Sequence, residues 1–359
     1  MKKIFGIVLA AAMMVGCGSS TKFTINGESE KFAGKWAFLQ VEQGQELVTI
    51  DSVAVTGNAF SLAGETEAPY AAYVVVKDAD AERPEFYAEV YVEPAKITIE
   101  EVAGERPSFK AVGGALNDAM NAVNDQLAAI EARMGEGDNS ALEAEYYATL
   151  YNAIISNNGN ILSQNILRSN YYAFEPQQVI DAIAIMPEQE QESFANMKKS
   201  AEQALKVLPG NTYIDITEEG TGEQPQTLTP DGKVLTLKSV VENKANKYVL
   251  IDFWASWSGP CMREVPYLVD TYKKFHNKGF EIYGVSFDRA REPWLKAIEE
   301  KELDWVHVSA VNYWDNKARH DYAVNSIPAN FLVDCSTGKI IAKGLRGEQV
   351  AATISELLK

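Results

Sequence analysis

The chain has few cysteines, few histidines and no long apolar run beyond its first residues. Three cysteines, Cys17, Cys261 and Cys335, occur in 359 residues, together with three histidines. Beyond the amino terminus, no segment is apolar enough to form a transmembrane helix. None of the histidines is placed by sequence beside a candidate nucleophile, which argues against a serine-hydrolase mechanism. No metal site and no cofactor-binding motif is predicted.

Basic residues are also scarce. Lysine and arginine number 33 against 50 acidic residues, giving a net charge of −17. Without Lys2 and Lys3, which lie in a segment predicted to be removed, 31 basic residues face 50 acidic ones, a net charge of −19. Such an acidic surface argues against nucleic-acid binding and against attachment to anionic lipid by charge.

The first twenty residues, MKKIFGIVLAAAMMVGCGSS, have the features of an export signal. The apolar run from Ile4 to Val15 is about a dozen residues long, too short to span a bilayer. The following Gly16-Cys17 resembles the bacterial lipobox. We therefore expect residues 1–16 to be a signal peptide and Cys17 to carry a lipid in the envelope membrane. Because Gly18-Ser19-Ser20 lacks an acidic run, we expect the protein to face the periplasm. The alternative is a secretory signal with an incidental cysteine.

The rest of the chain divides by hydrophobic period. Residues 17–113 show short alternating runs broken by turn residues, which predicts a small antiparallel β-domain. Residues 114–214 change to a helical period, with Pro187 opening a helix that ends before Gly210. Thr217 to Lys233 is typical of a linker or loose hairpin. Residues 215–359 alternate strands and helices, which predicts an α/β domain with a mixed sheet and helices on both faces.

One motif in the last region carries chemistry. A strand over 249–253 leads into FWASWSGPCMREVP, Phe253 to Pro266, with a helix predicted from about residue 260 to 276. The order of elements, this motif and the later Ser326-Ile327-Pro328 resemble thioredoxin, and more narrowly the membrane-anchored TlpA/ResA-like thiol–disulfide oxidoreductases of the redoxin superfamily. The resemblance covers about residues 225–359. The first half resembles the amino-terminal part, of unestablished function, that precedes such domains in envelope lipoproteins.

The resemblance assigns roles to individual residues. Ser258 takes the position of the nucleophilic cysteine, and Cys261 that of the resolving cysteine. Asp252 matches the buried acid that relays a proton. For substrate binding, Trp257 matches the aromatic residue before the motif. Pro328, preceded by Ile327, matches the cis-proline that holds the substrate backbone. The implied partners are envelope proteins with thiols or disulfides.

Ser258 departs from the family pattern, since a hydroxyl cannot form a disulfide and is a poor nucleophile without a base. It is also a preferred N-cap residue. Three functions stay open: one-cysteine exchange through Cys261, peptide binding without turnover, and a peroxidase that uses the Ser-x-x-Cys spacing. The peroxidase is less well supported, because peroxiredoxins have a thiolate-activating arginine at about the position where this chain has Pro328. Arg263 and Glu264 are either partner contacts or a solvated helix face.

Cys335 is predicted to be a poor disulfide partner for Cys261. It follows the strand that begins after Pro328, and seven residues of strand span roughly 23 Å. We expect it to be an unpaired thiol near a turn, and more accessible than Cys261.

Overall fold

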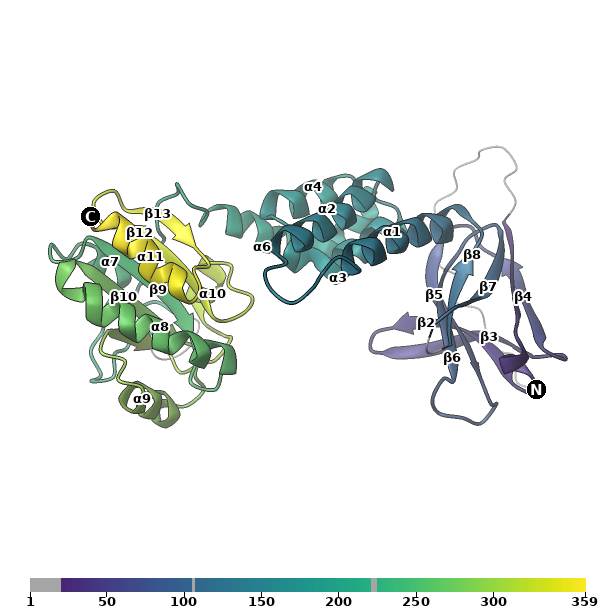
Figure 1. Ribbon diagram of the computed structural model, residues 1–359, viewed down its shortest axis with the longest axis horizontal. Helices are drawn as coiled ribbons and strands as arrows, with labels where there is room; N and C mark the ends of the chain where they lie inside the picture. Colours follow the sequence, from purple (N-terminus) through teal and green to yellow (C-terminus); the bar gives the residue numbers. More distant parts are fainter. Residues whose placement is uncertain (1–20, 105–106, 221–224) are drawn as a thin grey trace. The chain divides into compact units, whose positions relative to one another are not determined.

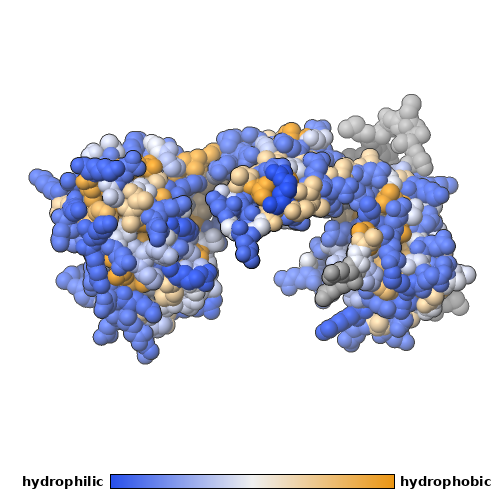
Figure 2. All heavy atoms as spheres, in the orientation of Figure 1, coloured by the Kyte–Doolittle hydropathy of each residue, from blue (hydrophilic) through white to orange (hydrophobic). Residues whose placement is uncertain are grey.

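The computed structural model describes residues 21–104, 107–220 and 225–359, so the predicted signal peptide and Cys17 lie outside the described residues. The chain forms two compact units, residues 1–173 and 174–359. The division falls within the segment predicted to be helical. Figure 1 shows the β-rich and helical parts of each unit, and on the face seen in Figure 2 hydrophilic residues predominate.

The described part of the first unit contains two four-stranded sheets, ordered β4-β1-β7-β8 and β3-β2-β5-β6. Alternating apolar residues turn one face of each strand inward, as Phe23 and Ile25 of β1 show. The β1–β7 pair is parallel, so the predicted antiparallel domain is in fact mixed at this one pairing. The strands are β1 Lys22–Glu28, β2 Trp36–Gln43, β3 Glu46–Ala54, β4 Ala59–Glu65, β5 Tyr70–Lys77, β6 Phe86–Val92, β7 Lys96–Val102 and β8 Ser108–Val112, with the 3-10 turn η1 Glu30–Phe32.

Helices complete the first unit. The predicted apolar stripe forms α1, with Leu116, Val123 and Leu127 buried along one face. Asn158, at a positive φ of 49°, follows the end of α2. The helices of this unit are α1 Ala115–Glu131, α2 Ser140–Ser156, α3 Ile161–Asn170 and the 3-10 turn η2 Tyr171–Ala173.

The second unit opens with helices that differ from the prediction. The single helix expected after Pro187 is split into two, because Phe194 leaves helical geometry (φ −106°, ψ 5°) between them and its side chain is buried. An additional helix precedes it, with Pro176 in its first turn. These elements are α4 Pro176–Ala184, α5 Glu188–Gln191, the 3-10 turn η3 Glu192–Phe194 and α6 Ala195–Leu205.

A five-stranded mixed sheet, ordered β11-β10-β9-β12-β13, forms the centre of the second unit. Strands β9, β10 and β11 are parallel, whereas β12 and β13 are antiparallel neighbours. The strands are β9 Tyr248–Trp254, β10 Phe280–Ser286, β11 Val306–Ser309, β12 Ala329–Asp334 and β13 Lys339–Lys343. Strands and helices alternate in this part of the unit, as the sequence predicted.

Helices cover both faces of this sheet, so the central strand β9 is buried on both sides. Leu250 and Trp254 pack with side chains of α8, α9 and α11, whereas Val249, Ile251 and Phe253 pack with those of α7 and α10. The helices are α7 Leu237–Val241, α8 Gly259–Phe275, α9 Arg291–Glu300, α10 Lys317–Asp321 and α11 Glu348–Leu357, with the 3-10 turn η4 His276–Lys278. This is a thioredoxin-like domain.

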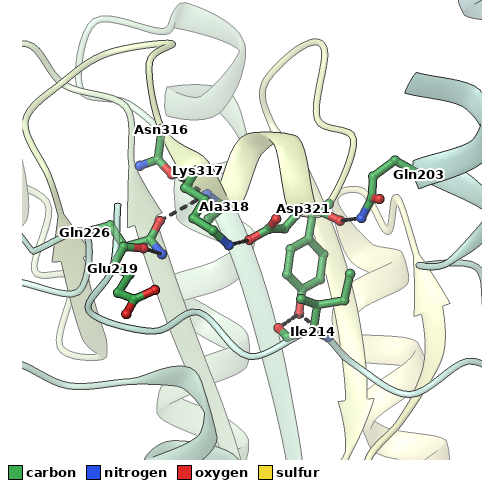
Figure 3. A network of polar contacts seen from close by, with 9 residues as sticks. Gln203, Ile214, Glu219, Gln226, Asn316, Lys317, Ala318 and Asp321 are labelled. Carbon is green, nitrogen blue, oxygen red and sulfur yellow. Dashed lines mark hydrogen bonds and ion pairs between the residues drawn. The ribbon is translucent and has the colours of Figure 1, made fainter. Parts of the chain in front are cut away.

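The described part of the segment before α7 is packed onto the domain, and of the two predicted forms it has the hairpin, with an isolated antiparallel bridge between Leu228 and Val234. Gln226 is fully buried and accepts a hydrogen bond from the N–H of Ala318 (3.1 Å) while donating to the carbonyl of Glu219 (2.8 Å). Gln203 of α6 donates to the carbonyl of Asp321 (2.7 Å). These contacts, drawn in Figure 3, fix α6 and Gln226 against α10.

Candidate functional site

Ser258 is the N-cap of α8. Its backbone is extended (φ −85°, ψ 105°), and its Oγ accepts a hydrogen bond from the N–H of Cys261 at 3.3 Å. This contact satisfies one of the N–H groups that the first helical turn leaves without a partner. The side chain is buried, at 4 % exposure. The hydroxyl is therefore engaged in the capping role that the sequence offered as an alternative.

Cys261 lies in the first turn of α8 and is buried, with 3 % of its surface exposed. It packs among Leu250, Trp254 and Val265. Burial raises the pKa of the Cys261 thiol to about 11, although the hydrogen bond with Ser258 and the charge of Arg346 act in the opposite direction. The position at the start of a helix, which usually favours a thiolate, does not offset burial here.

Asp252 lies behind Cys261 on β9 and is almost fully buried. Burial raises its pKa to about 7, the charge of Arg346 lowers it, and Glu264 raises it. Asp252, Cys261 and Pro328 line one cavity of about 10 Å³, whose other walls are Trp254, Glu264, Val265, Leu268, Leu303 and Trp305. Three of the residues selected from the sequence are thus brought together, and Asp252 titrates where it can exchange protons near neutral pH.

The loop before β12 provides the opposite wall of the site. The Ile327–Pro328 peptide bond is cis. Both residues are half-buried, and the Pro328 carbonyl accepts a hydrogen bond from Nη2 of Arg346. The two residues therefore reach the surface beside the cavity, where the resemblance to the family placed substrate contacts.

Trp257 is the most exposed of the selected residues, at 48 %. Its Nε1 donates to the carbonyl of Phe287 (3.3 Å), and its ring lies 5.3 Å from that of Tyr313. The preceding residue, Ser256, donates its N–H to the buried carboxylate of Asp288 (3.1 Å), which holds the loop in place. Trp257 and Tyr313 thus form a fixed aromatic edge next to α8.

Two charged residues complete the site, and one of them, Arg346, was not identified from the sequence. Arg346, just before α11, acts on both Asp252 and Cys261, but no local pattern distinguishes it. Asn330 fixes this segment through paired hydrogen bonds with the backbone of Leu345 (2.8 and 2.9 Å). Glu264, which the sequence left as either a partner contact or part of a solvated helix face, is half-buried, lines the cavity and accepts from the N–H of Gly347 (2.7 Å). Its position three residues after Cys261 was the available signal.

Cys335 is a free thiol, like Cys261. It is half-buried and packs against the core on the other face of the sheet, the face that α7 and α10 cover. Burial, followed by the charge of Asp334, raises its pKa to about 11. The prediction that the two cysteines do not pair is confirmed. Among the described residues, no group of three or more His, Cys, Asp or Glu is placed to hold a metal ion.

Comparison with known proteins gives two family matches. Residues 246–340 match a family described as thioredoxin-like. Residues 23–120 match a domain of unknown function, DUF4369, which covers the β-domain.

Curated relatives match the second unit. The chain is 30% identical over 139 residues to the thiol-disulfide oxidoreductase ResA of Bacillus thuringiensis subsp. konkukian, covering 38% of this chain and 75% of the relative. It is 31% identical over 140 residues to ResA of Geobacillus thermodenitrificans, covering 38% and 78%. Among solved structures, the thioredoxin domain of a thiol-disulfide oxidoreductase from Bacteroides vulgatus is 35% identical, covering 43% of this chain and 99% of that chain, with a TM-score of 0.36.

The matched region contains the whole of the cavity built around Asp252, Cys261 and Pro328. The sequence identity extends over most of the length of the ResA relatives, and the thioredoxin-like family match spans β9 to the start of β13. Through its carboxy-terminal domain, the chain belongs to the ResA family of thioredoxin-fold thiol-disulfide oxidoreductases.

Proposed function

We propose that this protein forms mixed disulfides with envelope proteins through Cys261 alone and does not complete a two-cysteine catalytic cycle. The observation that carries the proposal is the combination of a cysteine at position 261 and a serine at position 258, both at the start of α8. Cys261 shares its cavity with Asp252 and Pro328, whereas position 258 holds a hydroxyl that caps the helix. The site thus keeps a thiol, a proton acceptor and a backbone-binding loop, but only one sulfur.

The Cys261 thiol transfers its proton to the Asp252 carboxylate, and the thiolate attacks one sulfur of a partner disulfide. A new Cys261–partner disulfide forms, the partner's own disulfide breaks, and the second partner sulfur leaves as a thiolate that takes up a proton. An external thiol then attacks the mixed disulfide, which returns Cys261 to its reduced form and carries the oxidising equivalent away.

Burial makes this exchange slow. With a pKa of about 11 for Cys261, only about one thiol in ten thousand is ionised at pH 7. A peroxidase needs an activated thiolate, and so the raised pKa disfavours that alternative. A thiol that reacts slowly but lies beside a binding loop is better suited to capturing a held partner than to rapid turnover.

A second candidate, peptide binding without covalent chemistry, is favoured by the exposure of Trp257. An indole that is 48 % exposed and the half-buried Ile327 and Pro328 would provide apolar surface for an extended chain. This function would survive replacement of Cys261.

The test is capture of partners as mixed disulfides on non-reducing gels. The full-length wild type would be compared with Cys261→Ala, and with Cys335→Ala as the matched control for a free thiol. We expect adducts in wild type and Cys335→Ala that disappear in Cys261→Ala and on reduction. Adducts that require Cys335 instead would refute the proposal. If partners copurify with the wild type without forming adducts, and copurify equally well with Cys261→Ala, the second candidate is favoured.

We also propose that Cys17 anchors the protein to the envelope membrane with its folded units facing the periplasm. The support comes from the Lys-Lys start, the short apolar run and Gly16-Cys17. No described helix is both long and apolar enough to cross a bilayer. A fatty-acid probe should label the wild type but not Cys17→Ala. An unmodified Cys17 thiol in the mature protein would contradict the anchor.

A further inference from the structure

Arg289 is exposed beside the loop that leads into α8. Two residues earlier, the N–H of Phe287 donates to the carbonyl of Trp254 (2.8 Å), and the carbonyl of Phe287 accepts from Nε1 of Trp257 (3.3 Å). The backbone before Arg289 is therefore held at two points against residues 254–257, which immediately precede the cap of α8.

The guanidinium of Arg289 stacks on the aromatic edge. Its central carbon lies 3.7 Å from the centroid of the Tyr313 ring, which in turn lies 5.3 Å from the ring of Trp257. Among the described residues, the Arg289 side chain makes no hydrogen bond or ion pair. Three other arginines of the second unit donate to backbone carbonyls, namely Arg291, Arg319 and Arg346. Stacking uses the face of a guanidinium, so the N–H donors along the edge of Arg289 are available to a ligand.

Two carboxylates of this region are engaged elsewhere. Asp288 is fully buried and accepts hydrogen bonds from both the N–H and the hydroxyl of Ser256. Glu264 accepts from the N–H of Gly347 (2.7 Å). Neither forms an ion pair with Arg289. Within the described part of the chain, Arg289 thus carries an unpaired positive charge beside the site, although the net charge of the chain is −17.

The segment that presents Tyr313 is strained. Val311 and Tyr313 have φ angles of 52° and 59°, in the left-handed region that bulky and β-branched residues seldom adopt. The N–H of Tyr313 donates to the carbonyl of Asp288 (3.4 Å), and the N–H of Val311 donates to Oγ of Ser309 (3.0 Å). Strain of this kind is retained chiefly at functional sites, where surrounding contacts impose it. The strained turn therefore supports a functional role for the ring on which Arg289 stacks.

A guanidinium with a free N–H edge binds a carboxylate through two parallel hydrogen bonds. We propose that Arg289, supported by Tyr313, binds the carboxylate of an aspartate or glutamate close to the reactive disulfide of the protein partner, while Trp257 contacts the same segment. The class of partner is then a disulfide-bearing protein with an acidic residue near its reactive cysteine. Only the identity of the partner rests on the proposed function, whereas the carboxylate site itself does not.

The acidity of the whole chain does not oppose this contact. The Debye length is about 8 Å at physiological ionic strength, so acidic groups farther from Arg289 are largely screened, whereas a carboxylate in contact with it is not. The preference should therefore be for an acidic residue near the disulfide, not for an acidic protein. It should also weaken as the salt concentration rises.

The test uses the full-length protein and three short peptides with a central cysteine, flanked on both sides by glutamate, glutamine or lysine. Each cysteine carries a thiopyridyl group, which leaves as thiopyridone when a thiolate attacks the peptide sulfur. The adduct on Cys261 is followed by mass spectrometry. We expect wild type to capture the glutamate peptide about fivefold faster than the glutamine peptide, and the lysine peptide most slowly. Arg289→Glu should reverse the order of the glutamate and lysine peptides.

Two further variants serve as controls. Arg83→Glu changes an exposed arginine of the first unit; it alters the net charge equally and should keep the wild-type order. Tyr313→Asn removes the ring but places a residue there that tolerates a left-handed backbone, and it should reduce the preference for glutamate. Equal rates for the three peptides in wild type would overturn the inference, as would an unchanged order in Arg289→Glu.

Failure of this inference can be separated from failure of the proposed function by measuring binding without covalent chemistry. Peptides with serine in place of cysteine would be titrated onto Cys261→Ala and followed by fluorescence anisotropy. A preference for the glutamate peptide there, with no adduct in wild type, would support the carboxylate site and refute only the proposed function. Adducts on Cys261 at equal rates for all three peptides would refute only the carboxylate site.

Discussion

The two units of the molecule bury different kinds of side chain. In the described part of the first unit, the buried polar residues are Asn117, Ser163 and Gln164, and none of them carries a charge. Among the described residues of the second unit, four ionisable groups other than cysteines and tyrosines are buried, namely Asp252, Glu281, Asp288 and His307. Burying such groups is costly, and clusters of them mark functional sites more often than packing sites. The buried polar residues of the first unit therefore indicate packing, whereas the buried ionisable groups of the second unit indicate a functional site.

The largest effect should come from restoring the missing sulfur of the second unit. We expect Ser258→Cys to reduce insulin with dithiothreitol about a hundredfold faster than wild type, because a cysteine at the helix N-cap ionises far more readily than Cys261 and has a neighbouring thiol to resolve it. The double variant Ser258→Cys/Cys261→Ala is the control and should show no sustained turnover. An inactive Ser258→Cys would indicate that the groove has been remodelled for binding.

A core substitution in the first unit tests whether the two units are separable. Phe32 is fully buried against the rings of Phe60, Phe86 and Phe109. We expect Phe32→Ala to destabilise the β-domain by about 3–5 kcal/mol, measured by hydrogen exchange of the β-domain peptides. Alkylation of Cys261 should not change. The exposed Tyr87→Ala should cost less than about 0.5 kcal/mol. A changed Cys261 rate would show that the two units are coupled.

The buried carboxylate should make the second unit less stable as pH rises. The folded pKa of Asp252 is raised to about 7 from its usual 3.8. Between these values the unfolded chain ionises first, so stability falls, by up to about 4 kcal/mol. We expect Asp252→Asn to match wild type at pH 4 and to exceed it at pH 8. Tryptophan fluorescence during urea unfolding can follow this, since five of the six tryptophans lie in this unit. Equal stability at pH 8 would contradict the raised pKa.

The smallest effect concerns the cap. Ser258→Ala removes the acceptor for the N–H of Cys261 and should cost about 1 kcal/mol in urea unfolding. It should also slow alkylation of Cys261, because the Ser258 side chain also hydrogen-bonds with the thiol itself and lowers its pKa. Ser258→Asn, which can still cap, should restore most of the stability. A neutral Ser258→Ala would argue that the hydroxyl has another role.

Local patterns predicted the elements of the second unit well, because strand and helix periods depend on neighbouring residues. The helix expected from about 260 to 276 runs from Gly259 to Phe275. Phe194 shows the limit of that method, since its burial breaks a helix that local charges favour. The thioredoxin motif also located Cys261, Asp252 and Pro328, which share one cavity.

Residues far apart in sequence were not predictable in the same way. Arg346 contacts Pro328 eighteen positions earlier, and the Gly284 backbone lies against nitrogens from two separate segments, Trp254 and the pair Trp305 and His307. Neither feature has a local period or spacing, because each depends on strand register and on the packing of α8 and α11. The low accessibility of Cys261 was expected from the motif, but the rise of its pKa to about 11 depends on the packing of the folded core.

The cap at Ser258 also determines how long a captured partner would stay bound. With no second sulfur at the helix end, a disulfide on Cys261 has no internal route to release. The lifetime of such a complex would then be set by the concentration of thiol around the protein. In a strongly oxidising surrounding the partner would stay attached for long periods, and a rise in free thiol would release it. The thiol content of the surroundings would therefore control how long the protein holds its partner covalently.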